Sequence, residues 1–282
     1  MIEQPKLTYL LVGTVTKDLQ PDDTFTIGGT VTYASTVARI LGWQPIIVSR
    51  ASADFVPPAH LSDISWHVLP DTVTTTYRND YYPTGRVQTI GPIAKDIGPA
   101  DIPVEYQQSD IVHLCPLAQD VDSAVATVFD QAMLTATPQG WLRQWDERGV
   151  VSLGGWQILD AILPKLRAAV ISIEDVEGDW EIAKGWASKL SILVVTEGEA
   201  GATVFYHGES KSVPPRPAQP VDLTGAGDVF SAAFFIRLYE TGDVLQSARF
   251  ANVIASMALE RLGVEGVPDR SEIESYLADN PL

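Results

Sequence analysis

Short β-rich runs alternate with helical patterns along most of this chain, and this alternation limits the fold more than any other feature. We predict strands at residues 7–12, 45–49, 110–115, 150–153, 168–173, 191–196 and 202–207, and helices at 31–42, 121–134 and 176–190. Alternating strands and helices are typical of βα units. The sequence therefore predicts an α/β fold with a mostly parallel sheet that helices cover on both faces.

One segment, residues 72–90, breaks this rhythm. It is rich in Thr and Tyr around a Pro83-Thr84-Gly85 turn, which predicts a strand–turn–strand hairpin. The hairpin is either an edge of the main sheet or, with a further short strand near residues 22–27, a small β flap over a cleft. We favour the flap, within one domain over residues 1–282 whose lid comes from about 14–27 and 70–92.

Composition narrows the classes of function. With 282 residues, 45% of them hydrophobic, the chain can build one large α/β core, and no apolar run reaches the roughly 18 residues of a membrane span. A net charge of −17 disfavours nucleic-acid binding, which needs clustered Lys and Arg.

The N-terminus has the pattern of a first strand rather than a signal peptide, and the single Cys115 fits a reducing cytoplasm. The scattered His and Cys residues have no zinc-ligand spacing.

The stretch VDLTGAGDVFSAAF, residues 221–234, combines small residues and an acidic residue at the start of a predicted buried helix that ends at Gly242. Unpaired N–H groups and the positive end of the helix dipole favour an anion at such a site. A phosphate, or charge that develops during phosphoryl transfer, is a natural occupant. Asp228 is then either a carboxylate that interacts with the dipole or a general base for an attacking hydroxyl.

Four segments, in order along the chain, resemble motifs of the ribokinase-like (pfkB) carbohydrate kinases. They are residues 13–18 (GTVTKD), 28–35 (GGTVTYAS), 196–201 (TEGEAG) and 222–230 (DLTGAGDVF). The last is similar to the C-terminal signature of the family and is the most specific. The resemblance implies a ribokinase-like three-layer α/β/α fold with a small β-hairpin lid, and an ATP-dependent kinase that phosphorylates a hydroxyl group.

By this resemblance, Asp228 is the base that activates the acceptor hydroxyl. The N–H groups of Gly225, Ala226 and Gly227 form the anion hole for the transferring phosphoryl group. A glycine leaves out the Cβ that could block close approach to the backbone. No GxxxxGK[ST] loop occurs, so neutralisation of the phosphates depends more on Mg²⁺.

The other site residues that the resemblance implies form three groups. The acceptor would contact Asp18, Gly28, Gly29, Tyr33 and, on the flap, Arg86. The nucleotide would contact Thr196, Gly198, Gly201 and Asn252. Glu177 would hold Mg²⁺ through water, and Asp222 is similar to a residue that helps hold a monovalent cation in many relatives. Purely structural roles stay open: tight turns for the glycines, a solvated hairpin face for Arg86, and a satisfied buried amide for Asn252.

Two positions depart from the family pattern. Glu174 stands where the family has the Asn of Asn-x-x-Glu, and a carboxylate near a triphosphate is repulsive unless a metal lies between them. Tyr33 stands where ribokinases proper have an Asn that contacts the sugar, which argues against ribose. The chain is most similar to the inositol-kinase-like branch, so we predict a cyclitol such as myo-inositol as acceptor. A hexose, a pentose or a nucleoside stays an alternative.

Two other classes of function stay open. One is a non-catalytic sugar or nucleotide sensor on the same scaffold, against which the intact Asp228 argues. The other is an interaction protein whose flap mediates dimerisation. Pairing through the flap would accompany kinase activity, so both a monomer and a homodimer remain compatible with the sequence. We expect neither a nucleic acid nor a membrane as partner.

Overall fold

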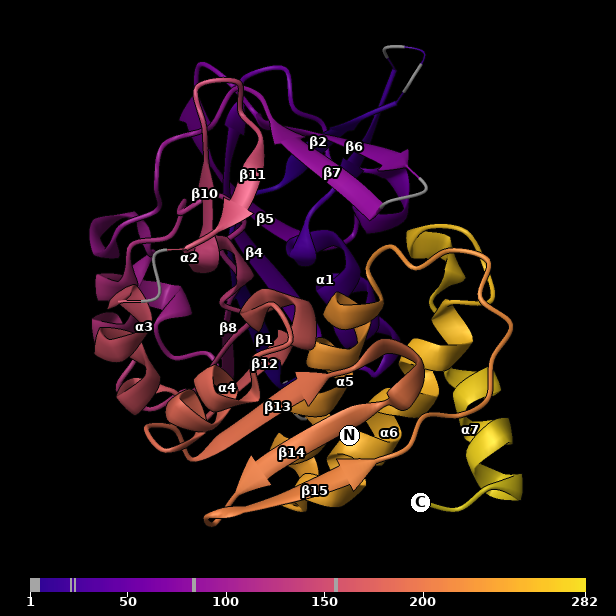
Figure 1. The fold of residues 1–282 in the computed structure, drawn as a ribbon. Coiled ribbons are helices and arrows are strands. Elements are labelled where there is room, and N and C mark those ends of the chain that lie inside the picture. The colour runs from indigo at the N-terminus through magenta and orange to yellow at the C-terminus, as the bar shows by residue number, and fades with distance from the viewer. Residues whose placement is uncertain (1–5, 21, 23, 83–84, 155–156) are drawn as a thin grey trace, which may run out of the picture.

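The central sheet has nine strands. The computed structural model describes the whole chain except residues 1–5, 21, 23, 83–84 and 155–156. The strands are β1 (Thr8–Val12), β4 (Gln44–Ser52), β5 (Ser65–Asp71), β8 (Ile111–Leu114), β9 (Met133–Ala136), β12 (Ala168–Ser172), β13 (Ile192–Thr196), β14 (Ala202–Tyr206) and β15 (Glu209–Val213). Their order is β15-β14-β13-β12-β9-β8-β1-β4-β5 (Figure 1). All neighbours from β13 to β5 run parallel, whereas β14 and β15 pair antiparallel at one edge. The predicted fold class is confirmed.

Helices cover both faces of this sheet. One layer contains α1 (Thr30–Ile40), α5 (Ala226–Thr241), α6 (Val244–Ala258) and α7 (Arg270–Asp279), and the other α2 (Gln139–Leu142), α3 (Gln157–Ile162) and α4 (Trp180–Ala187). Short 3₁₀ helices are η1 (Ala59–Leu61), η2 (Pro99–Asp101), η3 (Val104–Tyr106), η4 (Ser123–Val128), η5 (Leu163–Lys165), η6 (Ile173–Val176), η7 (Gly198–Ala200) and η8 (Val264–Gly266). Among the described residues, no helix has both the length and the apolar character to cross a membrane.

The two faces of β1 explain why its sequence is apolar throughout. Successive side chains of a strand point to opposite faces, so Tyr9 and Leu11 enter the cluster under α1 and α5, whereas Leu10 and Val12 enter the cluster under α3 and α4. All four are fully buried. The central strands are thus held by apolar contact on both sides, and their carboxyl ends are fixed for the segments that follow.

A second, four-stranded sheet, here called the small sheet, comprises β2 (Thr16–Leu19), β3 (Phe25–Gly28), β6 (Thr75–Tyr82) and β7 (Gly85–Ile90) in the order β3-β2-β6-β7. It lies beyond one end of the central sheet (Figure 1). The flap expected at residues 72–90 corresponds to β6 and β7, but its turn at 83–84 lies outside the described residues.

A hairpin of β10 (Arg143–Trp145) and β11 (Val151–Leu153) packs on the small sheet (Figure 1). The Ile90 N–H donates to the Gly149 carbonyl oxygen at 2.8 Å, and Trp145 and Val151 pack against the buried Tyr77 and Ile90. The hairpin, which follows α2 directly, is therefore held against the small sheet.

One prediction of secondary structure is wrong. The expected helix at 121–134 is only the 3₁₀ helix η4, and Met133–Ala136 forms β9 between β8 and β12. Burial of Leu134 and Ala136 inside the sheet outweighs the local helical pattern. The strand expected at 150–153 is confirmed as β11, which pairs with β10 in a hairpin outside the central sheet.

Candidate active site

The N-terminus of α5 presents main-chain N–H groups that have no acceptor in the described part of the chain. Gly225 is the residue before the helix and has a left-handed backbone with φ of 77°, and no side chain caps it. Among the described residues, the N–H groups of Gly225 and Gly227 have no acceptor, and that of Ala226 donates over a long 3.4 Å to the Leu223 carbonyl oxygen. These amides are therefore available to an anion at the positive end of the helix dipole.

Asp228 follows these amides in the first turn of α5. The hydroxyl of Thr30, at the start of α1, donates to its Oδ1 at 2.7 Å. Burial raises the pKa of Asp228 to about 6, although the Thr30 hydrogen bond acts in the opposite direction. A carboxylate with this pKa is charged at neutral pH and can accept a proton more readily than an ordinary aspartate, which suits a general base.

The predicted acceptor residues of the N-terminal half meet beside Asp228. Asp18 on β2 accepts a hydrogen bond from the Thr16 hydroxyl at 3.0 Å, and a Cβ on Gly28 would collide with the Asp18 carboxyl group. Gly29, with φ of 92°, is the residue before α1, so Thr30 follows it directly. Burial raises the pKa of Asp18 as well.

Tyr33 connects the start of α1 to the glycine loop. Its ring lies so close to Gly225 that a Cβ on that glycine would collide with it. Burial raises the pKa of the Tyr33 hydroxyl, and the nearby carboxylates of Asp228 and Asp18 add to this effect. The Tyr33 ring thus packs against the glycine loop at Gly225.

Two side chains of this site, those of Thr30 and Arg143, were not predicted from the sequence. Thr30 lies inside the double-glycine segment but was assigned no role. Arg143, at the start of β10, is 7% exposed, and its positive charge lowers the pKa of Asp18, Asp175 and Asp228. A lone Arg has no diagnostic spacing, so only the tertiary structure reveals that its charge acts on these carboxylates.

The predicted nucleotide residues lie at the end of β13, in the turn that follows it and on α6. Thr196 ends β13, and Gly198 and Gly201 form the tight turn to β14 with positive φ. The Asn252 amide is 6% exposed and donates to the carbonyl oxygens of Val213 and Pro214 at 3.0 and 3.1 Å. Asn252 therefore fixes the segment after β15, and its contact to a nucleotide stays a prediction.

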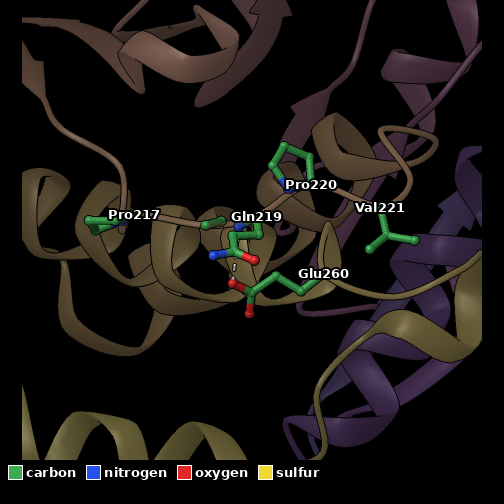
Figure 2. Close-up of a pocket in the computed structure, with 6 residues that line it drawn as sticks. Pro217, Gln219, Pro220, Val221 and Glu260 are labelled. Atoms are coloured by element: carbon green, nitrogen blue, oxygen red, sulfur yellow. Dashed lines mark hydrogen bonds between the residues drawn. The ribbon is translucent and has the colours of Figure 1, made fainter.

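A depression of about 730 Å³ borders the segment that enters the glycine loop. Figure 2 shows its lining residues, among them Pro217, Pro220 and Val221, and the hydrogen bond of 3.3 Å from the Gln219 N–H to Glu260 Oε1. A smaller depression of about 350 Å³ lies beside Arg216, Asn252 and Tyr276. Of the two depressions, only the smaller one is lined by a predicted nucleotide residue, Asn252.

The predicted cation ligands differ in exposure. Glu177 is exposed, with a left-handed backbone at the end of η6, and Glu174 is exposed too. The carboxylate of this segment that is buried is Asp175, which accepts a hydrogen bond from the Ser172 N–H at 2.8 Å. Asp222 accepts from the N–H groups of Thr224 and Gly263, each at 2.9 Å, and so ties two loops together.

No cluster of three or more His, Cys, Asp or Glu residues able to hold a metal occurs in the part of the chain that is described. Mg²⁺ in kinase sites usually keeps several waters and binds one or two carboxylates and the substrate phosphates. The exposed Glu177 and Glu174 are compatible with that mode. Arg86 lies on β7, but its side chain is outside the described residues.

Comparisons with known proteins identify relatives for both sequence and fold. Residues 169–270 match the model of the pfkB family carbohydrate kinases. A ribokinase of Bacillus subtilis is 45% identical over 89 residues, which cover 30% of each chain. A cytidine kinase of Thermococcus kodakarensis is 26% identical over 226 residues, covering 73% of this chain and 78% of that protein.

The fold is similar over nearly the whole chain to a solved structure of a pyrophosphate-dependent kinase in the ribokinase family, complexed with a pyrophosphate analog and myo-inositol. The TM-score is 0.80 at 19% identity, over 95% of this chain and 99% of that one. The match over residues 169–270 includes the glycine loop and Asp228. Residues 169–270 are thus similar to the pfkB carbohydrate kinases, and the chain as a whole has the ribokinase fold.

Proposed function

We propose that the protein transfers a phosphoryl group from ATP to a hydroxyl group of a small polyol. One observation carries this proposal: the buried carboxyl of Asp228, hydrogen-bonded by Thr30, follows directly on the loop in which the N–H groups of Gly225 and Gly227 have no acceptor among the described residues. This combination offers a proton acceptor and an anion site at the same place. The alternative of a non-catalytic sensor would need neither a carboxylate with a raised pKa nor open amides beside it.

In this proposal Asp228 takes the proton of the acceptor hydroxyl as its oxygen attacks phosphorus. The amides of Gly225, Ala226 and Gly227 stabilise the charge on the transferring group, since phosphoryl transfer depends mainly on positioning and charge stabilisation. Asp18 would accept hydrogen bonds from hydroxyls of the acceptor. The small sheet would cover the acceptor as a lid.

Mg²⁺ would neutralise phosphate charge when bound. Glu177 would hold it through water, and Asp222 would lie beside a monovalent cation. Because three carboxylates already surround the site, a chelator should abolish turnover, and added Mg²⁺ should restore it. The thermal midpoint without ligands should stay unchanged on chelation, since no described residue cluster forms a structural metal site.

A cyclitol such as myo-inositol is our first candidate acceptor, supported by the bulky Tyr33 and by the likeness to a kinase solved with myo-inositol. A sugar or a nucleoside is the second, supported by the ribokinase and cytidine kinase relatives. Pyrophosphate is the second candidate donor, because the same fold relative uses it.

A substrate screen tests the proposal. Purified protein with Mg²⁺ and either ATP or pyrophosphate is assayed for ADP or phosphate release across cyclitols, pentoses, hexoses and nucleosides. We expect one acceptor class to give turnover with one donor and a phosphorylated product by mass spectrometry. Silence across all acceptors with both donors would reject the kinase and support the sensor.

The pH dependence of this activity should report Asp228. The base is active as the carboxylate, so kcat/KM should be high above a pKa of about 6 and fall as the pH drops through it. Thr30→Val removes a hydrogen bond that lowers this pKa, so the acid limb should move to higher pH. The other groups that act electrostatically with Asp228 are Arg143, Asp18, Asp175, Tyr33 and Cys115.

Thr36→Val is the matched control, because the Thr36 hydroxyl donates to the Thr32 carbonyl oxygen inside α1. Its pH profile should coincide with that of the unmodified protein. If the acid limb of the kcat/KM profile is the same in Thr30→Val as in the unmodified protein, titration of Asp228 does not cause that limb.

A further inference from the structure

We propose that Arg143 belongs to the reaction centre and that Nε and Nη2 of its planar guanidinium group, here called its open side, bind the phosphoryl group during transfer. The inference rests on the kinase function proposed above and deepens it by one residue. The chain has no lysine-bearing phosphate loop, so the proposal also names the fixed positive charge of this site.

The guanidinium is clamped between two parts of the molecule. Its carbon lies 5.4 Å from the ring centroid of Tyr77 on β6, and Nη1 donates to the Leu117 carbonyl oxygen at 3.1 Å and to the Tyr77 hydroxyl at 3.5 Å. Tyr77 in turn donates to the same Leu117 oxygen at 2.5 Å. Leu117 follows β8 of the central sheet, and Tyr77 belongs to the small sheet, so the group is fixed where the two sheets meet.

Only part of the donor capacity is used. A guanidinium has five N–H groups, and among the described residues only Nη1 of Arg143 donates to protein acceptors. Nε and Nη2 have no acceptor among the described residues. Neither nitrogen is among the fully buried side-chain atoms that lack a hydrogen-bond partner, so each keeps some exposed surface. Both nitrogens therefore remain accessible to a ligand, in the fork geometry that matches two oxygens of a phosphate.

The charges around Arg143 favour an anionic ligand at Nε and Nη2. Asp18 of β2 is paired in register with Tyr77 of β6, the residue whose ring and hydroxyl Arg143 contacts. The charge of Arg143 acts on Asp18, Asp175 and Asp228, yet no described carboxylate forms an ion pair with it. A buried charge without a direct partner is costly. Three carboxylates would also repel an incoming phosphate. A phosphate oxygen on Nε or Nη2 removes both disadvantages at once.

A purely structural role is the competing explanation, because Arg143 also holds Tyr77 and Leu117 in place. That role predicts loss of stability with KM and kcat affected together. A role toward the phosphoryl group predicts loss of kcat at nearly constant acceptor KM, and a shift of the pH profile, because removal of the positive charge raises the pKa of Asp228.

The test compares Arg143→Gln and Arg143→Lys with Arg148→Gln, which removes the same charge from an exposed position of the same hairpin. We expect kcat of Arg143→Gln to fall on the order of 100- to 1,000-fold, with its acid limb at higher pH. Arg143→Lys should lose about tenfold, because it keeps the charge but not the fork. Arg148→Gln should match the unmodified protein in kcat and in the position of the acid limb.

Calorimetric binding of pyrophosphate without acceptor separates this inference from the proposed function. We expect Arg143→Gln to weaken binding by about tenfold or more, and Arg148→Gln to leave it unchanged. If no acceptor is turned over but this difference appears, the kinase proposal fails and the anion contact stands. A folded Arg143→Gln that keeps both kcat and pyrophosphate affinity overturns the inference. If Arg143→Gln does not fold, an Arg143→Lys variant with unchanged kcat and affinity overturns it instead.

Discussion

Asp228→Asn should lower kcat on the order of 100- to 10,000-fold, the usual contribution of a positioned general base. The asparagine keeps the shape of the side chain, and its carbonyl oxygen can still accept the Thr30 hydrogen bond. It cannot take a proton from the acceptor hydroxyl. Donor affinity should therefore change little, because the amides of the glycine loop remain in place.

The measurement is steady-state kinetics with the acceptor found in the screen, together with donor binding by calorimetry. Asp130→Asn is the matched control, since Asp130 is exposed and carries the same substitution away from the site. It should behave as the unmodified protein. Equal turnover in Asp228→Asn would remove this carboxylate from the mechanism.

Gly225→Ala should damage both folding and activity. At φ of 77° an L-residue is strained, which costs about 1–2 kcal/mol, and the added methyl group would collide with the Tyr33 ring. Either the ring or the loop must move, so the free amides lose their arrangement. We expect kcat to fall on the order of 100-fold or more, as for loss of an anion-hole donor, and the thermal midpoint to drop by a few degrees.

Gly227→Ala is the structural control for this prediction. Its φ is not positive, and no atom lies within 4 Å of the added Cβ, so its thermal midpoint should be equal or higher because alanine favours the helix. Calorimetric scans of both variants measure the contrast. Equal midpoints for Gly225→Ala and Gly227→Ala would mean that neither strain nor the Tyr33 contact matters at Gly225.

The start of α5 was predictable because its signals are local. Gly225, Asp228 and the apolar run that ends before Gly242 lie in one short stretch, and helix ends follow from such patterns. The parallel central strands were predictable for the same reason: burial on both faces leaves a continuous apolar run. Local sequence therefore predicted the helix α5 and the glycine loop at its start.

The partners of Asp228 were not predictable in this way. The Thr30 hydrogen bond joins residues 198 positions apart, and Arg143 reaches the site through a hairpin whose strands were not both expected. Likewise β9 carries a helical pattern, and only its neighbours β8 and β12 make it a strand. Contacts between distant segments decide these features, and no single-segment pattern contains them.

The two outer strands of the central sheet bear on how copies of the protein could associate. Glu209–Ser212 of β15 are exposed and include the ion pair of Lys211 with Glu209 at 3.1 Å, and β5 contains Pro70, which has no N–H to donate. Charged side chains and proline are common means by which proteins keep sheet margins from joining. Extension of the nine-stranded sheet into a continuous sheet across two subunits is therefore disfavoured, and self-association would have to use another surface.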